Sequence, residues 1–528
     1  MSRLAPVALV IACTHPPTTL PTERPIPAAH QPRLVVLLVI DQLPEWTFEA
    51  KVPALTGGFA RLLAEGAWHV GRHPSAATLT APGHALLGTG EPPAHSGILG
   101  NTWWRRDLER ELDATRDAEG NPTRAWLRVP GLGDAIATRP GARAVAVSLK
   151  DRAAILSLGH VGEPIWYDRR LPGWTSLAPI AWLDDWNRTH PIAAHLHDVW
   201  TPLDPARLAQ LSGTVDDQPG EVGEKGFGPT FPHALDATKD PADAIFAVPL
   251  GNDLVLDTAT RAIEAEHLGA DDTPDLLVIS LSANDYIGHG WGHESWEAWD
   301  AMLRLDRRLA TFLADLDRLV PGRWAMIATS DHGASPLPER VDGGRLTFDA
   351  LRDAANNAAS AVLGPGTWVV NAHYPNVFFS KAMLAQPKGE LASAEKRVMF
   401  GLRAFPGIAQ VGRVSDYAGH CETRTGDALA LCLALDPERS GDLFYLPAPG
   451  WILQDAGEPT ATAHGSMHDY DRLVPVILLD PERHTHAPET HPGSTIRRLE
   501  PAGAIEMVRI AAILARWLGV PPPTTLPR

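Results

Sequence analysis

The sequence predicts an α/β protein with a doubly wound, mostly parallel central sheet and inserted cap or loop subdomains. Two observations support the sheet. Five apolar runs rich in β-branched residues have the length of strands buried on both faces, and helical patterns lie between them. Each run is also followed at once by polar residues, and ligands of such sheets bind beyond the carboxyl ends of the strands.

The five predicted strands are LVVLLVIDQ (34–42), ARAVAVSLKDR (142–152), DLLVISLSAND (275–285), WAMIATSDHG (324–333) and LVPVILLD (473–480). The clearest helix runs from Ser295 to Val320, where apolar residues recur about every 3.6 positions until Pro321-Gly322 stops the pattern. Strand–helix alternation of this kind is typical of a doubly wound sheet.

Residues 32–520 are predicted to form a single catalytic domain. Within it, residues of about 105–250 and about 340–450 are proline-rich and irregular, and we expect them to be insertions, the second partly hairpin-like around 427–447. Cys421 and Cys432 lie in this second region. Their spacing suits a disulfide between neighbouring segments, and a pair of unlinked buried thiols fits equally well.

The N-terminus has the pattern of an export signal. An apolar run over residues 4–12 is too short to span a bilayer, which needs about 20 apolar residues. VIAC (10–13) resembles a bacterial lipobox, so we expect residues 1–12 to be removed and Cys13 to carry lipid, with 13–31 as a Pro/Thr-rich tether. An ordinary secretion signal or a misassigned start codon is the alternative. The predicted location is the periplasm or cell envelope.

The formal net charge of −17, from 46 basic and 63 acidic residues, disfavours binding to nucleic-acid polymers, which usually requires a basic face. No later apolar run reaches the length of a membrane span. Membrane association is therefore expected only through the lipid at Cys13. The sequence leaves the oligomeric state open and allows a monomer.

Carboxylates and imidazoles gather at the predicted strand ends: Asp41, Asp285, His289, Asp331, His332 and, just before the last strand, His464. A single Asp–His pair at a strand end is usually a helix cap beside a satisfied histidine. Three carboxylates and three imidazoles at one edge of one sheet indicate a metal centre, and mixed Asp/His ligands suit zinc. Six such ligands are too many for one tetrahedral site and about right for two.

In their order along the chain, VIDQ, TLTAPGHALLGTG, GILGNTWW, SLKDRAAI, NDYIGH, TSDHG and HGSMHDYD resemble the alkaline phosphatase superfamily, most closely its phosphate-irrepressible members with a threonine nucleophile. The resemblance covers residues 33 to 515. It implies two Zn²⁺ ions, one held by Asp285, His289 and His464. The other would be held by Asp41, Asp331 and His332, with the oxygen of Thr80 as an additional ligand.

The local sequence agrees with Thr80 as the nucleophile. Pro82 suits the first turn of a helix that GHALLG continues, so Thr80 lies at a helix N-terminus, which favours a phosphate or an alkoxide. Thr78 falls in the extended approach. A threonine hydroxyl is a poor nucleophile until metal coordination removes its proton. The resemblance implies a phospho-threonine intermediate that water then hydrolyses.

Three further residues bear on the substrate. Asn101, 21 residues after Thr80, matches the family position that donates to a phosphoryl oxygen. Lys150 and Arg152 are two apart on an expected extended segment, so both should point toward one phosphate. Two zinc ions and three carboxylates carry about +1, which these cations raise to about +3, and this favours a dianionic monoester over a monoanionic diester.

The sequence thus predicts an alkaline phosphatase that releases inorganic phosphate from a broad range of small phosphate monoesters. A phosphodiesterase or nucleotide pyrophosphatase of the same superfamily is the alternative, and a non-catalytic surface lipoprotein that keeps the fold is the alternative outside enzymes. A sulfatase is disfavoured because its Cys/Ser-x-Pro-x-Arg signature is absent around Thr80.

Four other polar residues lie close to these motifs. His84 is expected to support the nucleophile from behind, and His468 and Asp469 are expected to support His464. His293 lies four residues beyond His289 and is expected to be a loop histidine, with contact to metal or substrate as the alternative.

Overall fold

The structure is a computed structural model that describes residues 26, 30–481 and 502–525 of the 528. The predicted signal sequence (1–12), Cys13 and nearly all of the predicted tether lie outside the described residues. Among the residues described, no helix combines the length and the apolar character needed to cross a bilayer.

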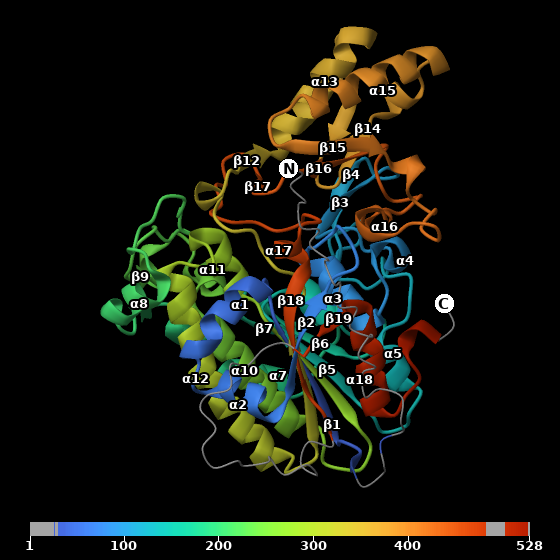
Figure 1. The fold of residues 1–528 in the computed structure, drawn as a ribbon. Helices are drawn as coiled ribbons and strands as arrows, with labels where there is room; N and C mark the ends of the chain where they lie inside the picture. The colour runs from blue at the N-terminus through green and yellow to red at the C-terminus, as the bar shows by residue number, and fades with distance from the viewer. Residues whose placement is uncertain (1–25, 27–29, 482–501, 526–528) are drawn as a thin grey trace, which may run out of the picture.

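A nine-stranded sheet forms the centre of the molecule, in the order β19-β2-β18-β11-β1-β10-β5-β6-β7 (Figure 1). Its strands are β1 (Leu34–Ile40), β2 (Ala67–Arg72), β5 (Ala144–Ser148), β6 (Glu163–Asp168), β7 (Gly173–Ser176), β10 (Asp275–Leu281), β11 (Trp324–Thr329), β18 (Leu473–Leu479) and β19 (Ala504–Glu506). β1 pairs in parallel with β10 and β11, and β10 with β5. All five predicted strands lie in this sheet, and the α/β fold is confirmed.

The last predicted strand runs against its neighbours. β18 pairs antiparallel with β11 and with β2. Its first residue therefore lies at the edge of the sheet where β1, β10 and β11 end. This direction brings the segment before β18, which contains His464, to the edge where the predicted carboxylate ligands follow their strands. A parallel β18 would place His464 at the opposite edge.

Helices cover both faces of the sheet. On one face α1 (Glu45–Lys51), α2 (Gly58–Glu65), α10 (Pro249–Ala265) and α12 (Trp296–Leu319) share a core with Val36, Leu38 and Ile40 of β1. On the other face α3 (Thr80–Thr89), α5 (Leu132–Ala137), α6 (Asp151–Leu156) and α18 (Ile510–Leu518) pack with Val35, Leu37 and Val39. β1 is buried along its whole length, which explains why it is a continuous apolar run.

The helix predicted from Ser295 to Val320 is α12. Ser295 is its N-cap, and the Ser295 side chain accepts a hydrogen bond from the backbone N–H of Ala298 at 3.0 Å. Its apolar stripe includes Leu305, Leu309 and Phe312, all buried against the sheet.

Residues 344–454 form a cap outside the central sheet, in the upper part of Figure 1. Its elements are β12 (Gly344–Thr347), α13 (Phe348–Leu363), β13 (Val369–Asn371), β14 (Asn376–Phe379), α14 (Lys381–Leu384), α15 (Lys388–Arg403), β15 (Ile408–Arg413), α16 (Gly426–Ala434), β16 (Leu443–Pro447) and β17 (Trp451–Gln454). The region 427–447 is α16 followed by β16, so the partly hairpin-like expectation is wrong there. A disulfide joins Cys421 to Cys432 of α16, a pairing that the sequence left open.

The predicted insertion at about 105–250 is only partly peripheral, because β5, β6 and β7 belong to the central sheet. Around them lie α7 (Leu183–Thr189), β8 (Val199–Trp200), α8 (Pro205–Ser212), β9 (His233–Ala234) and α9 (Pro241–Ala244), with the hairpin β3 (Thr102–Arg105) and β4 (Arg110–Asp113) close to its start. α4 (Pro93–Ser96), α11 (Ala283–Trp291) and α17 (Asp469–Arg472) complete the α-helices of the described chain.

Candidate active site

The six predicted metal ligands meet at the carboxyl edge of the sheet. Asp41 directly follows β1, Asp285 lies in the first turn of α11 after β10, and Asp331-His332 follows β11. His289 lies one turn further along α11, and His464 precedes β18. The three carboxylates come from the ends of three neighbouring parallel strands, so the topology of the sheet itself brings them together.

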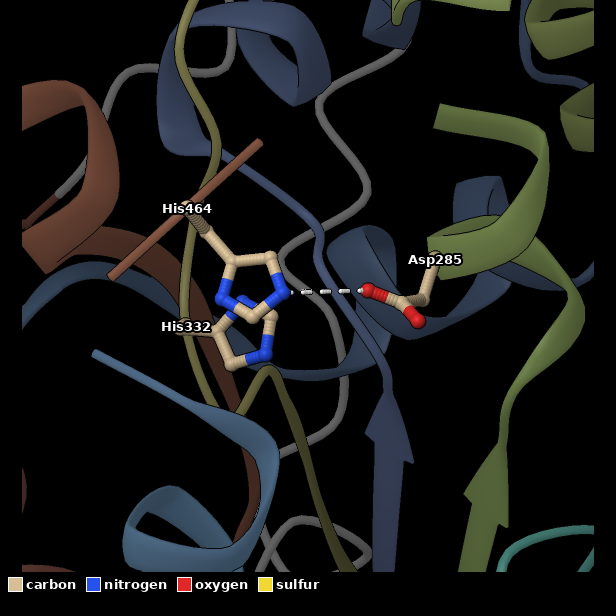
Figure 2. A group of neighbouring side chains, drawn as sticks. All are labelled: Asp285, His332 and His464. Carbon is tan, nitrogen blue, oxygen red and sulfur yellow. Dashed lines mark ion pairs between the residues drawn. The ribbon is translucent and has the colours of Figure 1, made fainter. Parts of the chain in front are cut away.

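The ligand atoms form two groups that share His332. Asp41, Asp331 and His332 each offer an atom within 4.8 Å of the others, and so do Asp285, His332 and His464. Figure 2 shows the imidazoles of His332 and His464 stacked, with ring centroids 3.7 Å apart, and Asp285 facing them. Nε2 of His464 lies 3.5 Å from Oδ1 of Asp285, and Nε2 of His289 lies 3.3 Å from the same oxygen.

The three imidazoles all present Nε2 to this centre. Their Nδ1 atoms lie within hydrogen-bond distance of backbone carbonyls: His289 at 2.8 Å from Thr462 O, His464 at 2.8 Å from Thr78 O, and His332 at 3.0 Å from Gly333 O. A carbonyl can only accept, so Nδ1 carries the proton in each ring. Each Nε2 then keeps its lone pair for a cation.

Two of the carboxylates each have one oxygen that accepts no hydrogen bond within the described chain. Oδ1 of Asp41 and Oδ2 of Asp331 are buried and accept no hydrogen bond from any described residue. Burial and the neighbouring Asp331 raise the pKa of Asp41 well above its usual value. Crowded, buried carboxylate oxygens beside imidazole Nε2 atoms are the donor set of zinc and similar divalent ions. The residues present therefore fit metal cations.

Lys150 lies between the two ligand groups. Its Nζ is buried 2.6 Å from Oδ2 of Asp41 and 2.6 Å from Oδ2 of Asp285. Burial alone would raise the pKa of Asp285, but Lys150 and His289 hold it well below its usual range. Lys150 thus ties the ends of β1 and β10 together electrostatically.

We expected Arg152 and Lys150 to lie on one extended segment, and they do not. β5 ends at Ser148 and α6 begins at Asp151, so Arg152 lies in the first turn of a helix. The two cations therefore occupy different places. Lys150 reaches the carboxylates, whereas Arg152 lines the open cleft described below.

Thr80 is the first residue of α3, with Pro82 in the first turn, as the sequence predicts. Its Oγ1 lies 3.5 Å from Nε2 of His332. Thr78 instead donates its hydroxyl to Ser466 O at 2.7 Å. Of the two threonines, Thr80 is the one with an oxygen beside the ligand atoms.

Asn101 is anchored next to the nucleophile. Its Oδ1 accepts a hydrogen bond from the backbone N–H of Ala81 at 2.8 Å. Because this bond uses the oxygen of the amide, the NH₂ end is the one left to donate to a ligand. Asn101 also lines the cleft, beside Leu79.

A cleft of about 820 Å³ opens onto the ligand atoms. Its inner wall includes Asn101, Arg152, His289 and His464, and its outer wall includes residues 222–227 and the cap residues Phe348 and His373. The cleft has room for more than a phosphate group, so leaving groups of different shape can enter it.

The supporting residues are placed partly as predicted. His84 lies behind the nucleophile, with Nδ1 2.9 Å from Thr80 O and Nε2 2.9 Å from Ser280 Oγ. The expectation that His468 and Asp469 support His464 is wrong. Nε2 of His468 lies 3.1 Å from Pro447 O, and Asp469 pairs with Arg72 at 2.8 Å. Nearness in sequence did not mean contact, because His468 lies beside Pro447 and Asp469 pairs with Arg72.

Sequence reasoning missed Gln42. This residue follows Asp41 in VIDQ and is fully buried, with Nε2 2.6 Å from Oδ1 of Asp285 and 3.2 Å from Nε2 of His289. His293 lies on its other side, where Nε2 is 2.6 Å from Oε1 of Gln42. His293 is thus placed behind the predicted ligands rather than among them. The position of Gln42 directly after a predicted ligand is the signal that could have revealed it.

Comparison with known proteins agrees with this geometry. A profile of the type I phosphodiesterase / nucleotide pyrophosphatase family matches residues 35–471. The chain is 28% identical to alkaline phosphatase PafA of Elizabethkingia meningoseptica over 86% of its length and 87% of the relative. It is 30% identical to alkaline phosphatase PhoK of Sphingomonas sp. over 85% of its length and 84% of the relative.

The chain is also similar to solved structures of PafA. The crystal structure of wild-type PafA superposes with a TM-score of 0.80 at 26% identity, covering 94% of this chain and 97% of that one. A PafA variant substituted at one threonine, one asparagine, one lysine and one arginine superposes equally well, with a TM-score of 0.80.

Proposed function

The chain belongs to the type I phosphodiesterase / nucleotide pyrophosphatase family, and from this premise we propose a two-zinc phosphate monoester hydrolase that acts through a phospho-threonine intermediate. It is a hydrolase of phosphate esters, and its similarity to alkaline phosphatases along most of its length favours the monoesterase over the diesterase. The observation that carries the proposal is the meeting of Thr80 Oγ1 with carboxylate oxygens and imidazole Nε2 atoms beside an open cleft.

In this proposal Asp285, His289 and His464 hold one zinc ion. Asp41, Asp331 and His332, with the Thr80 oxygen, hold the other. When bound, the two ions supply acidity to the nucleophile and stabilise the attacking and leaving oxygens of an in-line displacement. The buried oxygens of Asp41 and Asp331 that accept no hydrogen bond from a described residue support this assignment.

The residues of the chain position the reacting atoms. Thr80 Oγ1 gives up its proton and forms a bond to phosphorus as the bond to the ester oxygen breaks, and that oxygen takes up a proton and leaves as the alcohol. The N-terminus of α3 faces the negative charge that develops there. Asn101 donates from its amide nitrogen to a phosphoryl oxygen. Water then cleaves the phospho-threonine, which returns the threonine hydroxyl and releases inorganic phosphate.

Lys150 and Arg152 add the positive charge that a dianionic phosphoryl group requires. The substituted PafA variant supports these roles. Its threonine and asparagine are as far apart in sequence as Thr80 and Asn101 are here, and its lysine and arginine are two positions apart like Lys150 and Arg152. Because the spacings match, we assign the same four roles to Thr80, Asn101, Lys150 and Arg152.

The test compares an aryl phosphate with the matching bis-aryl phosphate. We expect kcat/KM for the monoester to exceed that for the diester by about 10²-fold or more, because the extra charge of the dianion is matched by fixed cations. A zinc chelator should abolish both activities, and added zinc should restore them. A preference for the diester would establish the phosphodiesterase alternative. Protein without bound zinc, and without activity when zinc is added, would establish a non-catalytic protein.

We also propose that the protein is exported and anchored through lipid at Cys13, with small phosphate monoesters as its partners. The Cys421–Cys432 disulfide supports an oxidising compartment. We expect Cys13→Ser to move the protein from the membrane fraction to the soluble periplasmic fraction of a bacterial host. Wild-type protein in the soluble fraction would contradict the anchor.

A further inference from the structure

Gln42 connects two of the predicted zinc ligands to a histidine outside the ligand set. Its Nε2 lies 2.6 Å from Oδ1 of Asp285 and 3.2 Å from Nε2 of His289. Its Oε1 lies 2.6 Å from Nε2 of His293. Gln42 is 0% exposed and His293 is 2% exposed, so no water competes freely for these bonds.

Asp285 determines which end of the Gln42 amide faces it, because a carboxylate oxygen can only accept a hydrogen bond, and the amide oxygen then faces His293. The amide oxygen can only accept a hydrogen bond, so the short contact requires Nε2–H of His293 to donate to it. The NH₂ end must then point to the Asp285 carboxylate, which can only accept. A reversed amide would place two oxygens against each other at Asp285.

The backbone around Gln42 is held in an unusual conformation. Its φ of 58° lies in the left-handed region, which a glutamine seldom adopts. Nδ2 of Asn284 donates to the carbonyls of Asp41 and Gln42 at 2.9 and 2.8 Å, and the N–H of Gln42 donates to Oδ1 of Asp331 at 3.2 Å. These bonds aim the Gln42 side chain at α11.

The helix that carries the ligands leaves space for this contact. Gly288 lies between Asp285 and His289 on α11, and a Cβ there would come within 2.2 Å of Oε1 of Gln42 and 2.4 Å of Nε2 of His293. The hydrogen bond between Gln42 and His293 therefore crosses α11 at a point where only glycine fits. Nζ of Lys51 holds the backbone of His293 from behind, 2.6 Å from its carbonyl.

We propose that Gln42 and His293 are positioning residues for the zinc ion that Asp285, His289 and His464 would hold. The amide donates to the Asp285 carboxylate and so orients it toward the imidazole of His289, one helical turn away, while Nε2–H of His293 holds the amide oxygen in place. This inference rests on the proposed function. Loss of a hydrogen bond that orients a metal ligand typically lowers metal affinity by about 10- to 100-fold.

Gln42→Asn tests the proposal. Asparagine tolerates the left-handed backbone, and its side chain is one methylene too short to reach both Asp285 and His293. In chelator competition we expect one of the two zinc ions to dissociate about 10- to 100-fold more readily, with the other unchanged. Gln386→Asn, the same change at a half-buried site in the cap, is the matched control and should leave both affinities unchanged.

His293→Leu provides a second, independent variant, because it removes the donor while the backbone bond from Lys51 can remain. It should weaken the binding of the same zinc ion as Gln42→Asn does. If Gln42→Asn does not fold, His293→Leu alone tests the proposal. Wild-type dissociation constants for both ions in the folded variants would overturn the positioning role. A wild-type protein that binds fewer than two zinc ions would overturn the proposed function first, and the inference with it.

Discussion

Thr80→Ala is expected to lower kcat/KM for an aryl phosphate by at least about 10³-fold, because it removes the hydroxyl that would attack the phosphorus. Thr80 Oγ1 lies 3.5 Å from Nε2 of His332, at the N-terminus of α3. The variant should still fold, since its methyl group fits where the threonine already packs.

Thr78→Ala is the matched control. Thr78 donates its hydroxyl to Ser466 O and lies two residues before the helix, so its loss should leave most of the activity. Acid quenching of wild-type protein with a ³²P-labelled substrate should trap label on Thr80 and none on Thr80→Ala. If both variants keep wild-type activity, Thr80 is not the nucleophile.

The strands nearest the site could be predicted because they are buried on both faces. β1, β10, β5 and β11 are continuous apolar runs, whereas a strand with one face in water would alternate apolar and polar residues. The short strands β2, β6, β7 and β19 at the two sides of the sheet lack such runs and were not predicted. The antiparallel direction of β18 was also missed, since direction depends on where the preceding chain lies and leaves no local pattern.

The candidate ligands could be predicted because Asp and His after strand ends are distinctive. Gln42 was not found, since a buried glutamine has no spacing rule and its role depends on a histidine 251 residues away. The placement of Arg152 was expected from the periodicity of a strand, but the chain turns into α6 at Asp151. Periodicity holds only while an element continues.

Arg152→Ala is expected to lower kcat/KM for the aryl monoester on the order of 10²-fold, and for the bis-aryl diester far less. Arg152 lines the cleft, and its Nε is buried with no hydrogen-bond partner among the described residues. A guanidinium in the wall of a cleft, one of whose donors has no partner, is suited to bind an anion. The monoester dianion carries the additional charge on the phosphoryl oxygens, so it loses more when the cation is removed.

Two further variants separate charge from packing. Arg152→Lys keeps the charge but not the planar fork of donors, so it should fall between wild type and alanine on the monoester. Arg352→Ala removes a cap arginine that pairs with Asp349 at 2.6 Å, and it should change neither substrate. Equal losses on monoester and diester in Arg152→Ala would make Arg152 a structural residue. The preference for monoesters would then have to come from Lys150, whose two carboxylate partners already hold it between the ligand groups.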